Sequence, residues 1–192
     1  FYGSLDTGFA VGNNGTILKT TNAGMTWSPS TSGTVNNLTG VFFTDYNTGY
    51  AVGSSIILKT TDQGFTWSQQ ASGYNLLSVY FTDANTGYTT SDNGSILKTT
   101  NAGATWTSLS SGTANPLYSI HFADANTGFA VGDLGTIVKT NDAGLTWYPQ
   151  TSGTTNTIYS VFFTDVNNGF TVDGNGGILN TIDGGCATPT VT

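Results

Sequence analysis

The sequence predicts an all-β protein, a β-propeller of five four-stranded antiparallel blades, on the strength of two repeating markers. A tryptophan recurs at intervals of 40, 39 and 41 residues, and its four copies are Trp27, Trp67, Trp106 and Trp147. A second marker ends in glycine followed by Phe or Tyr, at Gly8, Gly49, Gly87, Gly128 and Gly169. A fixed period of this length is typical of propellers and solenoids. Because the second marker occurs five times, we expect five structural units.

Each unit contains segments with the composition of short strands. In the fourth unit, residues 117–124 are rich in β-branched and aromatic residues and end at a turn sequence, Asp-Ala-Asn-Thr-Gly. Two more strands are expected at 129–132 and 136–140, joined by a connection of hairpin length. A fourth strand is expected at 146–148. Frequent glycines and the lack of a helical apolar period predict essentially no helix.

The units must stack on one another, because one four-stranded sheet cannot bury its own faces. Four strands per unit is the blade arrangement of a propeller; a β-solenoid is the alternative, with coils that are usually shorter. An open arc from a larger propeller is an alternative to a closed ring. We expect one propeller domain at residues 1–186, with blade units of about 1–36, 37–75, 76–115, 116–156 and 157–186. Residues 187–192 are expected to form a Thr/Pro tail or linker, or the strand that closes the ring.

The composition argues against several classes of partner. Only 8% of the residues are charged, the net charge is -7, and the chain contains neither arginine nor glutamate. Four lysines cannot make the basic surface that binds nucleic acid or anionic lipid. No apolar run is long enough for direct membrane insertion. Cys186 is the only cysteine, so an internal disulfide is impossible.

Each tryptophan closes a sequence of the form Thr-x-Asx-x-Gly-x-Thr-Trp, here called a box. The boxes span 20–27, 60–67, 99–106 and 140–147, and a fifth, at 181–188, has Thr188 at the tryptophan position. They resemble the Asp-box of bacterial neuraminidase repeats. The longer unit, with Gly-Phe/Tyr-Ala-Val-Gly before the Ile-Leu-Lys-Thr that leads into the box, resembles the propellers of the photosystem II assembly and stability factor family. That repeat also occurs in secreted bacterial surface proteins.

The resemblance implies that the box is a hairpin turn at the periphery of a blade. The residue types agree, since an Asx side chain accepts backbone N–H groups, glycine adopts positive φ, and tryptophan can pack beneath a turn. We therefore interpret the box residues as structural; they are Asn22, Gly24, Trp27, Asp62, Gly64, Trp67, Asn101, Gly103, Trp106, Asp142, Gly144, Trp147, Asp183 and Gly185. A fifth box without tryptophan is typical of a terminal repeat.

No catalytic residue or resident cofactor is expected. Neuraminidases hold their substrate carboxylate with arginines, so a chain without arginine lacks the means for that activity. Glycoside hydrolysis needs a pair of carboxylates, but most aspartates recur at fixed turn positions, which favours a role in the turns. These are Asp45, Asp83, Asp124 and Asp165 in one turn, and Asp62, Asp142 and Asp183 in the box. Only Asp92, Asp133 and Asp173 are less regular. The turns of the Asp45 type also begin like a Ca²⁺ loop but lack its later acidic ligands, which favours Asx-turns. His121 has no neighbours in sequence for a triad or a metal site.

The lysines also repeat. Lys19, Lys59, Lys98 and Lys139 share one register, and Asn180 takes the fifth position. A ring of lysines could bind an anion at the mouth of a channel. We favour the alternative, in which each lysine is solvent-facing or on an edge strand and pairs with a turn aspartate.

Three functions remain open. The favoured one is a non-enzymatic propeller module of a larger secreted or cell-surface protein, for adhesion, protein contact or spacing, because the chain is low in charge and ends in a Thr/Pro segment. The second is carbohydrate recognition or hydrolysis through exposed aromatic side chains. The third, implied by the resemblance, is an assembly factor for a membrane complex, although the arginine-rich surface of those factors is missing here. We expect a protein or glycan partner, an extracellular or cell-surface location, and further domains in the same polypeptide.

Overall fold

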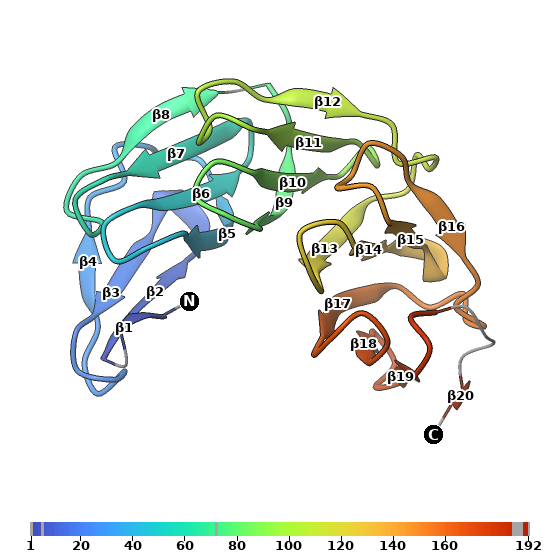
Figure 1. Ribbon diagram of the computed structural model, residues 1–192. Helices are drawn as coiled ribbons and strands as arrows, with labels where there is room; N and C mark the ends of the chain where they lie inside the picture. The colour runs from blue at the N-terminus through green and yellow to red at the C-terminus, as the bar shows by residue number, and fades with distance from the viewer. Residues whose placement is uncertain (1, 5, 72, 186–189, 192) are drawn as a thin grey trace. The chain divides into compact units, whose positions relative to one another are not determined.

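The computed structural model describes residues 2–4, 6–71, 73–185 and 190–191, and most of them lie in short strands and turns. The strands form five four-stranded sheets in which consecutive strands are neighbours (Figure 1). This is the blade arrangement of a propeller, so the predicted all-β fold class is confirmed. Within the described ranges, no helix is long and apolar enough to cross a membrane.

The five sheets are numbered here as blades in chain order. Blade 1 consists of β1 (Tyr2–Ser4), β2 (Thr7–Val11), β3 (Ile17–Thr20) and β4 (Ser28–Ser30). Blade 2 consists of β5 (Leu38–Phe43), β6 (Gly49–Gly53), β7 (Ile56–Thr60) and β8 (Ser68–Ala71). Blade 3 consists of β9 (Leu76–Phe81), β10 (Gly87–Ser91), β11 (Ile96–Thr99) and β12 (Thr107–Leu109). Blade 4 consists of β13 (Leu117–Phe122), β14 (Gly128–Gly132), β15 (Ile137–Thr140) and β16 (Tyr148–Gln150), and blade 5 of β17 (Ile158–Phe163), β18 (Gly169–Asp173), β19 (Ile178–Thr181) and β20 (Thr190–Val191).

The chain is divided into two compact units. The first comprises residues 1–87 and 99–106, and the second comprises residues 88–98 and 107–192. Blades 1 and 2 belong to the first unit and blades 4 and 5 to the second, while the strands of blade 3 are shared between them. Each contact described below lies within one unit.

The strand connections follow the expected pattern with one correction. Single 3₁₀ turns, η1 (Asn13–Gly15) and η2 (Asp133–Gly135), join the second and third strands of blades 1 and 4. The fourth strand was expected at 146–148, but β16 begins only at Tyr148. The N–H of Thr146 donates to the Asp142 carboxylate at 2.9 Å, so this residue belongs to the box turn and cannot also pair with β15.

The glycine of the second marker makes room for an aromatic ring on the adjacent strand. Gly128 on β14 pairs with Phe122 on β13. A Cβ at Gly128 would lie 2.6 Å from the Phe122 ring, closer than any stable contact. Gly49 and Gly169 face Phe43 and Phe163 in the same way. The marker glycine therefore meets a packing requirement inside blades 2 to 5.

The core lies between successive blades. At the junction of blades 1 and 2, Phe9 and Ile17 of blade 1 are buried together with Leu38, Ala51 and Leu58 of blade 2. At the junction of blades 4 and 5, the cluster combines the blade 4 residues Phe129 and Val131 with Ile158, Val161, Phe163 and Leu179 of blade 5. At each of these junctions, the earlier blade packs the face that it turns toward the next blade against the face that the later blade turns toward the previous one.

Candidate functional site

The Asx side chain of each box holds its turn closed. In the second box, Asp62 Oδ1 accepts the Thr66 N–H at 2.9 Å and the Thr60 hydroxyl at 2.8 Å, while Asp62 Oδ2 accepts the Thr66 hydroxyl at 2.6 Å. Thr60 Oγ1 in turn accepts the N–H of Gly64, whose φ is +78°. The fourth box has the same bonds around Asp142. Both oxygens of each of these carboxylates are therefore hydrogen-bonded within the turn.

Asparagine replaces aspartate in the first and third boxes with one bond reversed. Asn22 Oδ1 accepts the Thr26 N–H at 2.9 Å, but Asn22 Nδ2 donates to the Thr26 hydroxyl at 2.8 Å. Asn101 makes the same pair of bonds with Thr105. A threonine hydroxyl can donate or accept, so asparagine and aspartate are equivalent at this position.

The same hydrogen bonds make Asp62 and Asp142 poor proton donors. The Thr66 hydroxyl and N–H lower the pKa of Asp62 to about 2, and those of Thr146 lower the pKa of Asp142 to about 2. A carboxyl group with so low a pKa is ionised at neutral pH and has no proton to supply as a general acid. The box geometry therefore serves the turn and offers no acid catalyst.

Neighbouring blades are joined by a stacked pair of aromatic rings. The residue after the marker glycine stacks on the last residue of the first strand in the next blade. The pairs are Phe9–Phe43, Tyr50–Phe81 and Tyr88–Phe122, each with ring centroids 4.1 Å apart, and Phe129–Phe163 at 3.7 Å. We call this stacked pair, with the groups packed around it, a blade joint.

The box tryptophan packs edge-on against the joint. The indoles of Trp67, Trp106 and Trp147 lie 6.0, 6.0 and 6.1 Å from Phe43, Phe81 and Phe122, with interplanar angles of 84–88°. Their indole nitrogens have no hydrogen-bond partner among the described residues, so ring packing is their contribution. Trp147 is 7% exposed, whereas Trp27, whose box follows no earlier blade in this chain, is 44% exposed.

The repeated lysines also belong to the joints, which corrects the expectation that they pair with turn aspartates. Each Nζ donates to a main-chain carbonyl in the box of the next blade, namely Lys19 to Gln63, Lys59 to Ala102, Lys98 to Ala143 and Lys139 to Gly184, at 2.7–2.8 Å. Each ammonium also lies 5.4–5.6 Å from the centroid of the stacked ring on its own blade. Burial lowers the pKa of Lys19, although the Asp62 charge opposes the shift.

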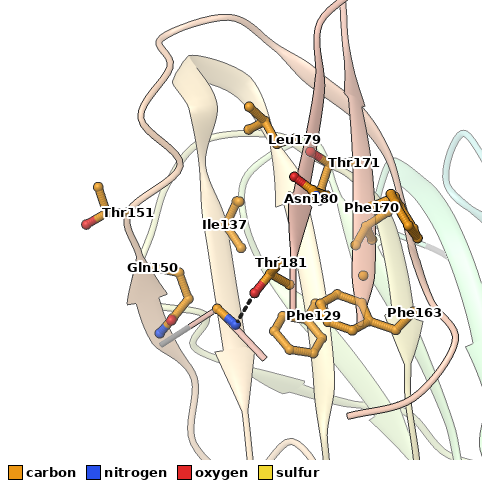
Figure 2. A pocket seen from close by; sticks show the side chains of 13 residues that line it. Phe129, Ile137, Gln150, Thr151, Phe163, Phe170, Thr171, Leu179, Asn180 and Thr181 are labelled. Atoms are coloured by element: carbon orange, nitrogen blue, oxygen red, sulfur yellow. Dashed lines mark hydrogen bonds between the residues drawn. The ribbon is translucent and has the colours of Figure 1, made fainter. Parts of the chain in front are cut away.

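Figure 2 shows the joint between blades 4 and 5, where the rings of Phe129 and Phe163 lie near Thr181 of the fifth box. In the fifth box, Thr181 Oγ1 donates to Asp183 at 2.7 Å and accepts the Gly185 N–H at 2.8 Å, so the first half of the turn is conventional. Residues 186–188, including Cys186 and the tryptophan position, lie outside the described residues. A cavity of about 50 Å³ lies here, bordered by Phe129, Phe163, Gln150 and Gly185. It is far smaller than the several hundred Å³ of a small-molecule site.

The less regular aspartates and the aspartates of the first turn are hydrogen-bonded within the protein. Asp45 Oδ1 accepts the N–H groups of Asn47 and Thr48 at 2.7 and 2.9 Å, and the corresponding turns of blades 3, 4 and 5 match it. These are the Asx-turns that the sequence favoured over a calcium loop. Asp173 accepts the N–H groups of Asn175 and Gly177. Within the described ranges, no three His, Cys, Asp or Glu side chains lie close enough to hold a metal ion.

Aromatic side chains gather on the first strands of blades 4 and 5, where those of blade 4 are half-buried and those of blade 5 are exposed. Tyr118 and His121 lie on β13, and Tyr159 and Phe162 lie on β17. The rings of Tyr118 and Tyr159 are 5.3 Å apart, and those of His121 and Phe162 are 4.9 Å apart. Tyr159 and Phe162 are each 55% exposed. We call these four residues the inner-strand aromatic surface.

Local backbone irregularities bring these rings to one face. Both β13 and β17 shift register at their second residue, Tyr118 and Tyr159 respectively, as in a β-bulge. One extra residue reverses the alternation of side chains, so residues three apart, such as Tyr118 and His121, share a face. In the first unit, Phe42 and Tyr80 form a comparable pair at 5.1 Å.

Polar groups border the aromatic surface. Burial and the nearby Asp133 carboxylate raise the pKa of Tyr118, so its hydroxyl stays protonated and able to donate. Asp133 is held in place by the Thr157 hydroxyl, which donates to it at 2.8 Å. Burial lowers the pKa of His121, so the imidazole is neutral at physiological pH. The surface thus combines flat apolar faces with one carboxylate and hydroxyl groups at its edge.

The sequence analysis singled out the residues of the box and did not predict the inner-strand aromatic surface. The box residues come together in separate turns, one in each blade. His121, interpreted from the sequence as a packed or half-exposed strand residue, is half-buried on β13 and lies against Phe162. The available signal was the recurrence of aromatic residues at the position before the last residue of each first strand, where the sequence has Phe42, Tyr80, His121 and Phe162.

Comparison with known proteins gives one family match. The model of the photosynthesis system II assembly factor YCF48 family matches residues 1–114 and 68–141. A YCF48 solved with a D1 peptide bound has a TM-score of 0.74 and 22% identity, over 93% of this chain and 62% of that chain. YCF48 from Cyanidioschyzon merolae has a TM-score of 0.76 and 20% identity, over 97% and 67%.

Enzymes share the fold as well. A GH74 enzyme from Niastella koreensis has a TM-score of 0.72 and 18% identity, over 95% of this chain and 37% of that one. At these identities the structural likenesses show the propeller fold alone. This chain spans 62% of the peptide-bound relative and 67% of the one from Cyanidioschyzon merolae. A comparison with curated proteins found no match.

Proposed function

Because the chain belongs to the photosynthesis system II assembly factor YCF48 family, we propose that it is a non-enzymatic module that binds a polypeptide partner through the inner-strand aromatic surface. The observation that carries the proposal is the exposure of Tyr159 and Phe162 beside Tyr118 and His121. Elsewhere, the aromatic rings of the joints are used to hold blades together. The inner-strand rings of Tyr159 and Phe162 lie outside the joints and are more than half exposed.

The chemistry of the surface suits an uncharged or basic peptide with apolar side chains. Tyrosine and phenylalanine rings supply a large contact area with few rotatable bonds, which keeps the entropy cost of binding low. Asp133 and the net charge of -7 disfavour an acidic partner. The lysines that could have attracted acidic groups are hydrogen-bonded within the joints.

A non-enzymatic role is supported by the state of the titratable groups. The box aspartates and the Asp45-type aspartates accept backbone N–H bonds in turns, and Asp62 and Asp142 have pKa values of about 2. The family description names an assembly factor, which is a binding role. One structural relative was solved with a D1 peptide bound, which is the kind of interaction proposed here, although the present chain has no arginine and its partner is a separate question.

Selection of peptides on the intact chain tests the proposal. Random peptides displayed on phage are selected on the immobilised protein, and affinities of the enriched peptides are measured by calorimetry. The double variant Tyr159→Ser/Phe162→Ser should weaken binding at least ten-fold. The control is Tyr148→Ser, because Tyr148 is 53% exposed but lies on β16, away from the surface. Peptides that bind both variants as tightly as the parent chain would rule the surface out.

Carbohydrate recognition is the second candidate, and one arrangement favours it. The Tyr118–Tyr159 ring pair beside the Asp133 carboxylate offers both a stacking platform and an acceptor for sugar hydroxyls. A GH74 xyloglucanase from Xanthomonas campestris is among the structural neighbours, with a TM-score of 0.68 and 14% identity, over 92% of this chain and 34% of that one. Retention on a panel of neutral glycans, lost in Tyr159→Ser, would support this function in place of peptide binding.

We further propose that the module acts outside the cell or at its surface, within a larger polypeptide. The low charge and the Thr/Pro segment at the end of the chain support this. Brief protease treatment of intact source cells, followed by mass spectrometry, should release peptides of this chain. Their release only after lysis would contradict the proposed location.

A further inference from the structure

One residue in the turn between β14 and β15 has an unfavourable backbone conformation. Leu134, in η2, has a φ of +54° and is 70% exposed. A bulky side chain is rare in this left-handed region, which asparagine adopts more readily. The same position of the turn is occupied by Asn14 in blade 1, Asn93 in blade 3 and Asn175 in blade 5. Blade 4 therefore presents a leucine to solvent where three other blades have asparagine, at a cost to the stability of the turn.

The main-chain N–H of Leu134 also differs from its counterpart in blade 1. Asn14 has the same conformation, with a φ of +55°, and its N–H donates to Asn37 Oδ1 at 3.0 Å. Thr157 takes the place of Asn37 in blade 4, and its hydroxyl donates to Asp133 at 2.8 Å. Among the described residues, none accepts a hydrogen bond from the Leu134 N–H. The turn therefore leaves one donor available to a group outside the chain.

Leu134 borders a groove that lies within the second unit. The groove has a volume of about 790 Å³, in the range of binding sites. Its walls are formed in part by the loops that lead from blade 3 to blade 4 and from blade 4 to blade 5, and the lining includes Gly112, Thr113, Pro149, Ser152, Gly153 and Thr154. Small hydroxyl side chains of this kind can donate and accept hydrogen bonds, which suits the polar backbone of an extended peptide. Leu134 adds an apolar contact at the border.

The turn connects this groove to the inner-strand aromatic surface. Burial and the neighbouring Asp133 carboxylate raise the pKa of Tyr118, which places Asp133 beside the aromatic surface. Asp133 and Leu134 are consecutive residues of η2, so the aromatic surface and the groove meet at this turn. A peptide that lies on the rings of Tyr118 and Tyr159 can therefore continue past Asp133 into the groove.

We propose that η2 and the groove form the part of the peptide-binding site that determines sequence specificity, with Leu134 as the specificity-determining residue. This inference rests on the proposed peptide-binding function and describes the peptide that suits it. The peptide has an apolar residue on the Tyr118–Tyr159 rings, an uncharged or basic residue beside Asp133, and a second apolar residue on Leu134. An acidic residue beside Asp133 would be repelled. One peptide carbonyl accepts the Leu134 N–H.

Leu134→Asn tests the inference, because asparagine is the residue that the chain itself uses in this turn. Its melting temperature should equal that of the parent chain or exceed it by up to about 3 °C, since the left-handed conformation becomes easier to adopt. Its affinity for a peptide selected by phage display on the intact chain should fall about five-fold or more in calorimetry, because an apolar contact is lost. Leu134→Met, which keeps an apolar side chain, should retain most of the affinity.

Leu145→Asn is the matched control. Leu145 is 69% exposed, like Leu134, but it lies in the box of blade 4, outside η2 and the groove. The control should therefore bind the peptide as the parent chain does. Equal affinities of Leu134→Asn and Leu145→Asn would overturn the inference.

A double-mutant cycle shows whether the peptide contacts Leu134. Each apolar residue of the selected peptide is replaced by alanine, and its affinities for the parent chain and for Leu134→Asn are compared. One replacement should lose most of its effect in the variant, because the contact that it removes is already absent. Additive effects at every peptide position would overturn the inference, while loss of binding in Tyr159→Ser/Phe162→Ser would still support the proposed function. Peptides that bind independently of Tyr159 and Phe162 would contradict both.

Discussion

Replacing the box tryptophan by alanine should lower the free energy of unfolding strongly only where another blade precedes the box. Trp147 is 7% exposed and Trp27 is 44% exposed, so Trp147 covers about 80 Å² more apolar surface, given that a tryptophan buries about 200–250 Å². At about 25 cal/mol per Å², this is about 2 kcal/mol. The edge-on contact with Phe122 adds about 1 kcal/mol. Trp147→Ala should therefore lower the free energy of unfolding by about 3 kcal/mol more than Trp27→Ala.

Urea denaturation followed by far-ultraviolet circular dichroism measures the difference. Trp67→Ala belongs in the same series, because Trp67 lies in the same unit as Trp27 and packs against Phe43 at 6.0 Å. Equal losses for Trp27→Ala and Trp147→Ala, with unchanged urea dependence, would refute the assignment of the tryptophan to the joint.

Three further predictions concern a box glycine, the box aspartates and a lysine of the joints. Gly64→Ala should lower the free energy of unfolding by about 2 kcal/mol more than Gly33→Ala does. Both residues have positive φ, but only at Gly64 would the added Cβ lie 2.5 Å from a ring of the preceding blade. Thermal unfolding of the two variants measures the difference. The pKa values of Asp62 and Asp142 are about 2 in the folded protein and about 3.9 in the unfolded chain, so their stabilising effect is present above pH 4 and is lost as the pH falls toward 2. In the double variant Asp62→Asn/Asp142→Asn, the free energy of unfolding measured by urea titration should fall less over this pH range. A pH dependence equal to that of the parent chain would contradict the prediction. Lys139→Met should lower the free energy of unfolding by about 1–2 kcal/mol, because it removes the hydrogen bond to the Gly184 carbonyl. An unchanged free energy of unfolding in chemical denaturation would show that this hydrogen bond does not stabilise the protein.

The fold and the box could be predicted because their information is local. A turn such as that of Asp62 is closed by residues within four positions, and its sequence carries all of its donors and acceptors. Strand positions follow from short apolar segments between such turns. The late start of β16 at Tyr148 was missed because the residue before Trp147 donates its N–H to the box, a choice between two partners that composition does not reveal.

The joints and the aromatic surface could not be predicted because their partners are one repeat away. Lys59 bonds to the carbonyl of Ala102, 43 residues later, and a carbonyl leaves no trace in the sequence. The proximity of His121 and Phe162 depends on how two blades stack. The recurrence of the lysine signalled that it has a role, but only the stacking of blades shows which atom it contacts.

The claim that the inner-strand aromatic surface binds a polypeptide is tested most directly by ¹⁹F NMR of the chain labelled with fluorotyrosine. A peptide selected on the intact protein is titrated into the sample, with resonances assigned by single Tyr→Phe variants. We predict that the signals of Tyr118 and Tyr159 shift or broaden on binding, while that of Tyr148, which is 53% exposed against 55% for Tyr159, stays in place. Binding that moves Tyr148 and leaves Tyr118 and Tyr159 unchanged would contradict the account.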